Sequence, residues 1–256
     1  MVARRAPATS APPPPAAAES LAERQARARA INEALTAYYG EPVPTPVEER
    51  RDPLSELILV VLSQHTSDAN SDRAFASLRA RFPDWEAVRT APVEEVAAAI
   101  RSGGLATLKA VRIQRILNQI RERTGRLDLE FLRQLPLSEA RAFLRALDGV
   151  GPKSAACVLL FSLGLPAMPV DTHVHRVARR LGLIAPRLSA EAAHDELERL
   201  VPAEEIYRFH VNLIRHGRQI CKAQRPRCPS CPIQHLCPYP RTVAATSAPA
   251  AAAAAP

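Results

Sequence analysis

The sequence has few of the features that mark membrane, secreted and β-rich proteins. Aromatic residues make up only 4% of the 256 residues, so a hydrophobic core has to be aliphatic. No apolar run approaches the roughly 18 residues that a membrane-spanning helix needs. No stretch alternates polar and apolar residues with a period of two, which argues against a β fold. No internal repeat is evident.

Both ends of the sequence lack the periodicity of folded segments. The N-terminal stretch starts with basic residues, but prolines interrupt it before an apolar region forms, so it does not resemble a secretory signal peptide. We therefore predict disordered, low-complexity tails over residues 1–19 and 241–256. We also expect a cytoplasmic, nucleoid-associated monomer without membrane association, whose cysteines stay reduced.

The charge balance favours an anionic partner. Lys and Arg number 34 against 26 Asp and Glu, and the formal net charge is +8. Basic side chains bind phosphates by displacing counterions, so nucleic acid is a natural partner class. The hydrophobic fraction of 47% is sufficient for one or two globular domains.

Between the tails, apolar residues recur with helical spacing almost throughout. Ser20 and Glu23 form a capping-box pattern that predicts a helix start, and Gly40 is a typical end for that helix. Phe75 and Leu78 share one face of a later helical stretch. About ten helices joined by short turns predict an all-α fold.

Four of the five cysteines cluster near the C-terminus with the spacing C-x6-C-x2-C-x5-C. They are Cys221, Cys228, Cys231 and Cys237. Four thiolates can bind one zinc ion or an iron–sulfur cluster, and the spacing is compatible with both. In a reducing compartment either is favoured over disulfides. The fifth cysteine, Cys157, lies in an apolar helical run and is predicted to be buried.

The segment Gly149-Val150-Gly151 interrupts two helical stretches. Its glycines allow positive φ angles and close approach of the backbone. Successive amide groups in such a turn can bind an anion such as a DNA phosphate. Pro152 suits the first position of the next helix. A plain interhelical turn is the alternative, and the G-x-G pattern alone does not distinguish the two.

Lys153 and Asp171 are the candidate catalytic pair. Lys153 falls in the first turn of a helix, where the helix dipole disfavours a cation; this favours a lowered pKa and a nucleophilic amine. Asp171 is expected to cap the helix that starts near Thr172. A carboxylate near the amine could also receive its proton. The alternatives are a solvated lysine and an aspartate that only caps. His173 and His175 diverge on that helix, so we expect no shared metal ion.

The cysteine array, the hairpin lysine and an aspartate 18 residues later resemble the endonuclease III branch of the helix–hairpin–helix DNA glycosylases. The resemblance extends from about Leu21 to Tyr239. It implies two helical lobes with a DNA-binding cleft between them. One is a six-helix barrel over residues 55–165 that ends in the hairpin. The other is a [4Fe–4S] cluster lobe built from residues 20–54 and 166–240.

The resemblance also implies a chemistry. In that family the equivalent of Lys153 is the nucleophile, the equivalent of Asp171 is its partner, and the four cysteines hold a structural [4Fe–4S] cluster. The expected function is base-excision repair. A damaged base, here an oxidised pyrimidine, is flipped from duplex DNA and released. The abasic site is then cleaved on its 3′ side by β-elimination.

Several further residues are expected to contact DNA by resemblance. Gln64 or His65 and, from another turn, Leu105 would fill the gap left by the flipped base. The family usually has glutamine where His65 stands and often has tyrosine at Ala106, and these departures bear on the range of lesions. Phosphate contacts are expected from the hairpin residues Gly149, Val150 and Gly151 and from Lys222, Arg225 and Arg227.

The alternatives for these contacts are structural. Gln64 and His65 could form a polar helix end followed by a capping Asp68. The basic residues between the cysteines could be a solvated charged loop. For the whole protein, one rival is a monofunctional glycosylase for uracil, mispaired thymine or adenine, which would not nick DNA. The other is a non-catalytic zinc module that binds DNA, which would be colourless.

Overall fold

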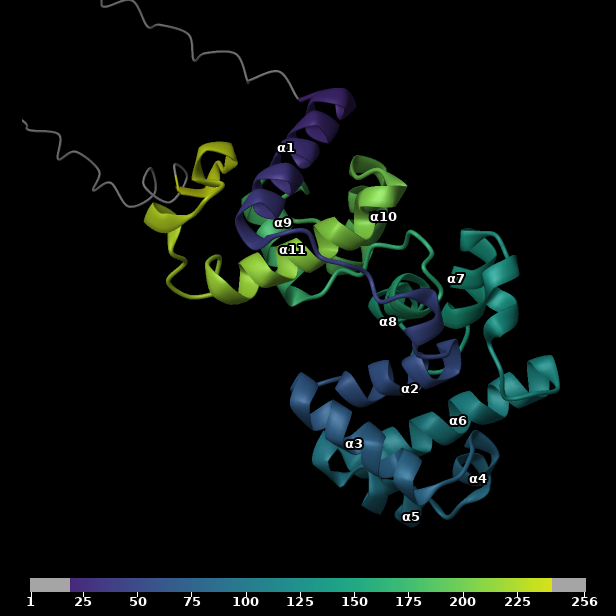
Figure 1. Ribbon diagram of the computed structural model, residues 1–256. Helices are drawn as coiled ribbons and strands as arrows, with labels where there is room; N and C mark the ends of the chain where they lie inside the picture. Colours follow the sequence, from purple (N-terminus) through teal and green to yellow (C-terminus); the bar gives the residue numbers. More distant parts are fainter. Residues whose placement is uncertain (1–18, 241–256) are drawn as a thin grey trace, which may run out of the picture.

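A computed structural model describes residues 19–240 (Figure 1). Apart from Glu19, the predicted disordered tails over residues 1–19 and 241–256 lie outside the described residues. Every regular element in the described part is helical, so the predicted all-α fold is confirmed. None of its helices combines the length and apolar character that crossing a membrane requires.

Eleven α-helices make up most of the described chain. They are α1 Leu21–Tyr39, α2 Pro53–Ser63, α3 Asp68–Arg81, α4 Trp85–Thr90, α5 Val93–Ala99, α6 Ala106–Thr124, α7 Leu137–Arg145, α8 Pro152–Cys157, α9 Thr172–Arg180, α10 Ala190–Leu200 and α11 Ile206–Gln219. Short 3-10 turns cover Val47–Glu49, Arg101–Gly103, Glu130–Gln134, Ala203–Glu205, Cys228–Ser230 and Gln234–Leu236.

The first helix starts and ends where its local sequence predicts. The Ser20 hydroxyl accepts a hydrogen bond from the Glu23 amide, and the Glu23 carboxylate accepts one from the Ser20 amide at 2.7 Å. This capping box satisfies two backbone donors that a helix start leaves without partners. Gly40, with φ at 78°, follows the last turn.

Two separate apolar cores divide the described chain, and we name the lobes after them. The barrel lobe comprises α2 to α8, and its buried core runs from Leu54 to Ala167. The terminal lobe comprises α1, α9 to α11 and the cysteine loop over residues 221–237, and its core includes Ile31 and Phe209. In Figure 1 α1 lies beside α11, and it also packs against α10, so the two ends of the described chain form one lobe.

The helix that follows the hairpin belongs to both lobes. Helix α8 packs against α2 and α7 in the barrel lobe and against α10 in the terminal lobe. It continues into a π-helical turn over Val158–Ser162, where the Leu163 amide donates to the Val158 carbonyl. Leu159 packs into the barrel core and the next residue, Leu160, into the terminal core.

Asp68 does not cap a helix, contrary to the structural alternative considered for this segment. It is the first residue of α3, the preceding Ser67 takes the N-cap position, and neither side chain makes a capping bond. The Asp68 carboxylate instead pairs with the Arg218 guanidinium of α11 at 2.9 Å. Both side chains are exposed, so this contact between the lobes contributes at most about 1 kcal/mol.

Candidate functional site

The hairpin between α7 and α8 uses its two glycines differently. Gly149 has φ at 71°, and a Cβ there would lie 2.5 Å from the Arg112 Nε. The positive φ therefore favours glycine, and a larger residue would also displace the Arg112 side chain. Gly151 has φ at −82°, so of the two glycines only Gly149 uses the positive φ that the pattern allows. As the N-cap of α8 it adopts extended backbone, which any residue can adopt.

The hairpin still presents open backbone. A Cβ on Gly151 would meet no atom within 4 Å. The Val150 side chain is only 5% exposed, and its amide donates to the Leu147 carbonyl within the turn. Within residues 19–240 no acceptor takes the amides of Gly151 and Lys153. These two amides are therefore available to an anion at the start of α8.

Lys153 is the second residue of α8 and is half-buried. One turn later on the same helix lies Cys157, which is buried as predicted, with 6% exposure. Burial raises the pKa of the Cys157 thiol to about 11, and the nearby Lys153 amine opposes that rise. The lysine therefore lies beside a neutral thiol at neutral pH.

Asp171 precedes α9 and caps it as predicted. Its Oδ1 accepts a hydrogen bond from the Val174 amide at 2.7 Å. Burial lowers the pKa of the neighbouring His210 to about 4; the Asp171 charge opposes this shift and the Lys153 charge reinforces it. Both charges also act on the Cys157 thiol. The charges of the lysine in the barrel lobe and of the aspartate in the terminal lobe thus act on the same two buried groups.

Two buried histidines that the sequence reasoning missed hold the peptide before Asp171. His210 of α11 donates from Nδ1 to the Pro169 carbonyl at 2.9 Å. The Val170 amide donates to Nε2 of His194 of α10 at 3.1 Å. Burial lowers the pKa of His194, which keeps the accepting nitrogen unprotonated. Only the position of these histidines on apolar helix faces could have indicated them, and that pattern carries no hint of their partners.

Gln64 and His65 follow α2 and behave differently. The Gln64 Oε1 accepts from the Arg112 guanidinium at 2.6 Å, and its Nε2 lies 3.5 Å from the Gly149 carbonyl. Gln64 is therefore packed against the hairpin. His65 is exposed and has φ at 56°, a left-handed conformation that is uncommon outside glycine.

Backbone strain coincides with three of the predicted DNA contacts. His65, Leu105 and Arg225 are the non-glycine residues with positive φ in the described part of the chain. Leu105 has φ at 48°, and its side chain is 55% exposed although it is large and apolar. Such conformations are costly and cluster at functional sites and ligand clamps. These three residues present their side chains from three different loops.

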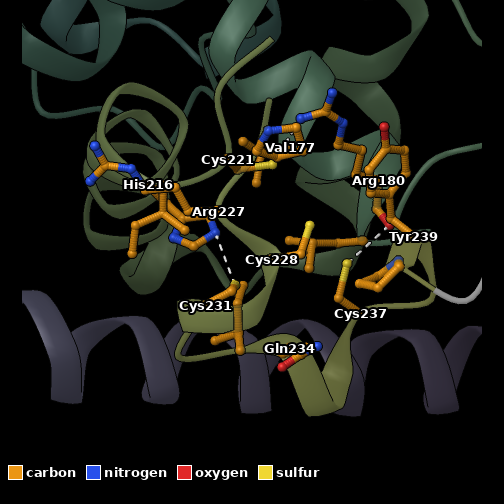
Figure 2. Close-up of a pocket in the computed structure, with 15 residues that line it drawn as sticks. Val177, Arg180, His216, Cys221, Arg227, Cys228, Cys231, Gln234, Cys237 and Tyr239 are labelled. Atoms are coloured by element: carbon orange, nitrogen blue, oxygen red, sulfur yellow. Dashed lines mark hydrogen bonds between the residues drawn. The ribbon is translucent and has the colours of Figure 1, made fainter. Parts of the chain in front are cut away.

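The four clustered cysteines line one pocket of the terminal lobe (Figure 2). The Arg180 guanidinium donates to the Cys221 Sγ at 3.4 Å, and the His216 Nε2 lies 3.6 Å from the Cys231 Sγ. Burial raises the pKa of Cys231 to about 11 and also raises that of Cys237. Within the described residues no three His, Cys, Asp or Glu side chains converge closely enough to hold a single metal ion.

Arg180 organises the loop between the first two of these cysteines. Besides Cys221, it donates to the carbonyls of Lys222 and Ala223, at 2.7 and 3.0 Å, and it stacks over the Tyr239 ring. The basic side chains of this loop extend into solvent. They are Lys222, Arg225 and Arg227.

The sequence and fold match a known family. Residues 58–203 match the model of the HhH-GPD superfamily base excision DNA repair proteins. The chain is 36% identical over 202 residues to endonuclease III of Escherichia coli (strain K12), covering 79% of this chain and 91% of that protein. It also matches the solved structure of a trapped endonuclease III–DNA covalent intermediate, with 31% identity and a TM-score of 0.72 over 86% of this chain and 98% of that one.

A plant relative is similar over a shorter part of its length. The chain is 42% identical over 173 residues to an Arabidopsis thaliana protein named as a DNA glycosylase. That match covers 68% of this chain but only 59% of the plant protein.

These matches and the helical fold place the chain among a family of DNA repair proteins. The chain belongs to the HhH-GPD superfamily of base excision DNA repair proteins.

Proposed function

We propose that this protein is a bifunctional DNA glycosylase and abasic-site lyase. It releases oxidised pyrimidines from duplex DNA and nicks the resulting abasic site, acting as a monomer on DNA in the cytoplasm. The observation that carries the proposal is the shared neighbourhood of Lys153 and Asp171: one amine and one carboxylate, from different lobes, both act on His210 and Cys157. The trapped covalent complex of a related endonuclease III supports a covalent intermediate.

The proposed chemistry begins when the damaged nucleotide leaves the base stack. The Lys153 amine attacks the sugar C1′, the bond to the base breaks, and Asp171 accepts the amine proton. Its carboxylate also stabilises positive charge that develops at the sugar. The C1′–O4′ bond then breaks and the sugar ring opens, which leaves a Schiff base between the lysine and C1′ and makes the C2′ proton acidic. Loss of that proton expels the 3′ phosphate and nicks the strand.

The DNA is proposed to lie against the three strained loops and the hairpin. His65 and Leu105 enter the stack, because both are exposed and left-handed while Gln64 is engaged by Arg112. The amides of Gly151 and Lys153 bind a phosphate at the start of α8. Lys222, Arg225 and Arg227 bind the backbone further along, where they position the DNA without reading its sequence.

The donor set of the cysteine loop fits a [4Fe–4S] cluster. Four thiols line one pocket, and the Arg180 cation beside Cys221 compensates the negative charge that thiolates bring. Bound there, the cluster would supply a structural tie for the loop and its basic side chains. The loop residues themselves bind DNA. A broad visible absorbance band, with iron and sulfide measured in the purified protein, would separate this cluster from colourless zinc.

The deciding experiment is borohydride trapping on a duplex with an abasic site. Lys153→Gln should reduce the trapped complex to background and abolish nicking, while DNA affinity stays close to wild type. Lys222→Gln removes the same charge from the exposed loop and is the matched control; it should weaken binding and its salt dependence but keep trapping. Trapping by Lys153→Gln at the wild-type level would disprove the lysine assignment.

The lesion class needs its own experiment. Duplexes that carry thymine glycol, dihydrouracil, uracil or an abasic site should be scored separately for base release and for nicking. The proposal predicts release and nicking on the two oxidised or reduced pyrimidines and nicking on the abasic duplex. Base release from uracil without nicking would instead favour a monofunctional glycosylase.

A further inference from the structure

A buried lysine links the two turns from which His65 and Leu105 extend. Lys109 is only 3% exposed, although lysine is among the residues least often buried. Its ammonium donates to the Leu62 carbonyl at 2.6 Å and to the Gly103 carbonyl at 2.7 Å. No acidic side chain pairs with it among residues 19–240. Its partners are two main-chain oxygens, and each lies just before one of the strained loops.

The geometry explains why a cation is retained at this depth. Leu62 is in the last turn of α2, where carbonyl groups lack helical partners and the helix dipole favours a positive charge. Gly103 ends a 3-10 turn that leads to the left-handed Leu105. A neutral apolar side chain at position 109 would leave two buried carbonyls without donors, which is costly.

The positions of the tips follow from those two anchors. His65 lies three residues after Leu62, and Leu105 lies two residues after Gly103. A Cβ on Gly103 would lie 3.2 Å from the Ala74 Cβ, so this turn is packed tightly against α3. Both anchors are therefore fixed while both tips are exposed and strained.

We propose that Lys109 is a positioning residue that sets the spacing of the two side chains inserted into DNA. The inference rests on the proposed function, because it assumes that His65 and Leu105 enter the base stack. Lys109 touches no DNA in this proposal and acts through the Leu62 and Gly103 carbonyls. Its loss is expected to misplace the two tips relative to each other, which impairs extrusion of the base more than the chemistry at the sugar.

Helix α6 offers a matched control. Gln114 is buried on the same helix, and its amide also donates to two main-chain carbonyls, those of Val88 and Ala91 at 2.9 and 2.7 Å. These carbonyls lie at α4, away from both tips. Lys109→Met and Gln114→Met therefore each remove two buried donors from one helix, but only the first change affects the inserted loops.

The test compares these variants on two duplexes. One carries thymine glycol and reports base release. The other carries an uncleavable abasic analogue opposite 2-aminopurine, whose fluorescence reports insertion without turnover. Lys109→Met should lower single-turnover base release roughly 10- to 100-fold relative to Gln114→Met, as expected for misplacement by about an ångström. Lys109→Met should also lower the 2-aminopurine fluorescence that reports insertion. Its rate of nicking at a natural abasic site should fall by a smaller factor than base release.

A second substitution of Lys109 tests for rescue, and the two assays distinguish failure of this inference from failure of the proposed function. Lys109→Gln keeps a donor and should recover part of both signals; it also replaces Lys109→Met if that variant does not fold. Insertion and base release by Lys109→Met equal to those of Gln114→Met would overturn the inference. A wild-type protein that inserts into the analogue but releases no base would instead overturn the proposed function, and the insertion signal would still decide the role of Lys109.

Discussion

The barrel lobe and the terminal lobe build their cores in different ways. The barrel core draws on one continuous stretch, from Leu54 to Ala167, and is almost wholly aliphatic. The terminal core joins α1 to α9–α11, so it must close a long loop before its contacts form. The terminal lobe also buries His194, His210 and His216 and carries the cysteine loop. Both lobes bury polar side chains, but the buried histidines and the cysteine loop lie in the terminal lobe.

The difference matters because the site takes one catalytic candidate from each lobe. Lys153 belongs to a helix that packs on both lobes, whereas Asp171 depends on the terminal lobe alone. A change that destabilises the terminal lobe should therefore displace the Asp171 carboxylate before it affects Lys153. Trp85, the single tryptophan, lies at the barrel core, so its fluorescence reports one lobe selectively.

The largest effect is expected from Asp171→Asn. Asparagine still caps α9, so the fold should persist, but the proton acceptor is lost and base release should fall about 10²- to 10⁴-fold. Asp84 is the matched control in the barrel lobe, because its Oδ1 caps α4 at 2.8 Å from the Ala87 amide. Asp84→Asn should leave release unchanged in the same single-turnover assay. Equal rates for the two variants would contradict the catalytic role.

Loss of one cysteine of the proposed [4Fe–4S] site should separate the lobes in an unfolding experiment. If the cluster is bound as proposed, Cys228→Ser should abolish its visible absorbance and destabilise the terminal lobe, because cluster binding would contribute folding free energy. Hydrogen exchange in α1 and α11 should accelerate, while Trp85 fluorescence should report a nearly unchanged barrel transition. A common shift of both signals would mean that the lobes unfold as one unit.

Acid should weaken the terminal lobe through His210. Its folded-state pKa of about 4 lies below the ordinary value of 6.5, so the unfolded chain binds more protons between these values. The stabilisation is complete above about pH 6.5 and is lost as the pH falls toward 4, by on the order of 1–3 kcal/mol. The groups that act on it are Asp171, Lys153 and His194.

His210→Asn tests this pH dependence. The asparagine amide can still donate toward Pro169 but cannot become charged. The variant should therefore lose less stability than wild type between pH 6.5 and 4 in urea unfolding followed by helix content. Parallel pH profiles for the two proteins would exclude His210 as the source.

The smallest effect is expected from the helix cap of α1. Ser20→Ala removes the capping bond to the Glu23 amide and should cost about 1 kcal/mol of terminal-lobe stability. Trp85 fluorescence should not change. Ser20→Asp, which restores an acceptor, is the control and should recover most of the loss in the same hydrogen-exchange measurement of α1.

Local patterns predicted the features that depend on neighbouring residues. The capping box of α1, the helix cap at Asp171, the buried Cys157 and the all-α fold follow from spacing within a few residues. The positive φ of Gly149 also agrees with its local G-x-G pattern, which allows that conformation. The start of α8 at Pro152 was also predicted, and it makes Gly151 the N-cap of that helix.

Long-range contacts were not predictable in the same way. Lys109 and His210 gain their roles from main-chain groups far along the chain, and nothing in their own segments marks those partners. The Asp68–Arg218 pair likewise joins segments 150 residues apart. The choice of His65 over Gln64 in the proposed function likewise rests on the contact of Gln64 with Arg112, which lies on another helix.

The π-helical turn after α8 has a consequence for how this protein tolerates insertions and deletions. Within that turn Leu159 packs into one core and Leu160 into the other. Removing one residue would restore an ordinary helix and rotate everything after it by about 100° around the axis. The helix would then pack its side chains correctly in one lobe but misplace those that enter the other core. The number of residues in this turn is therefore constrained as tightly as their identity.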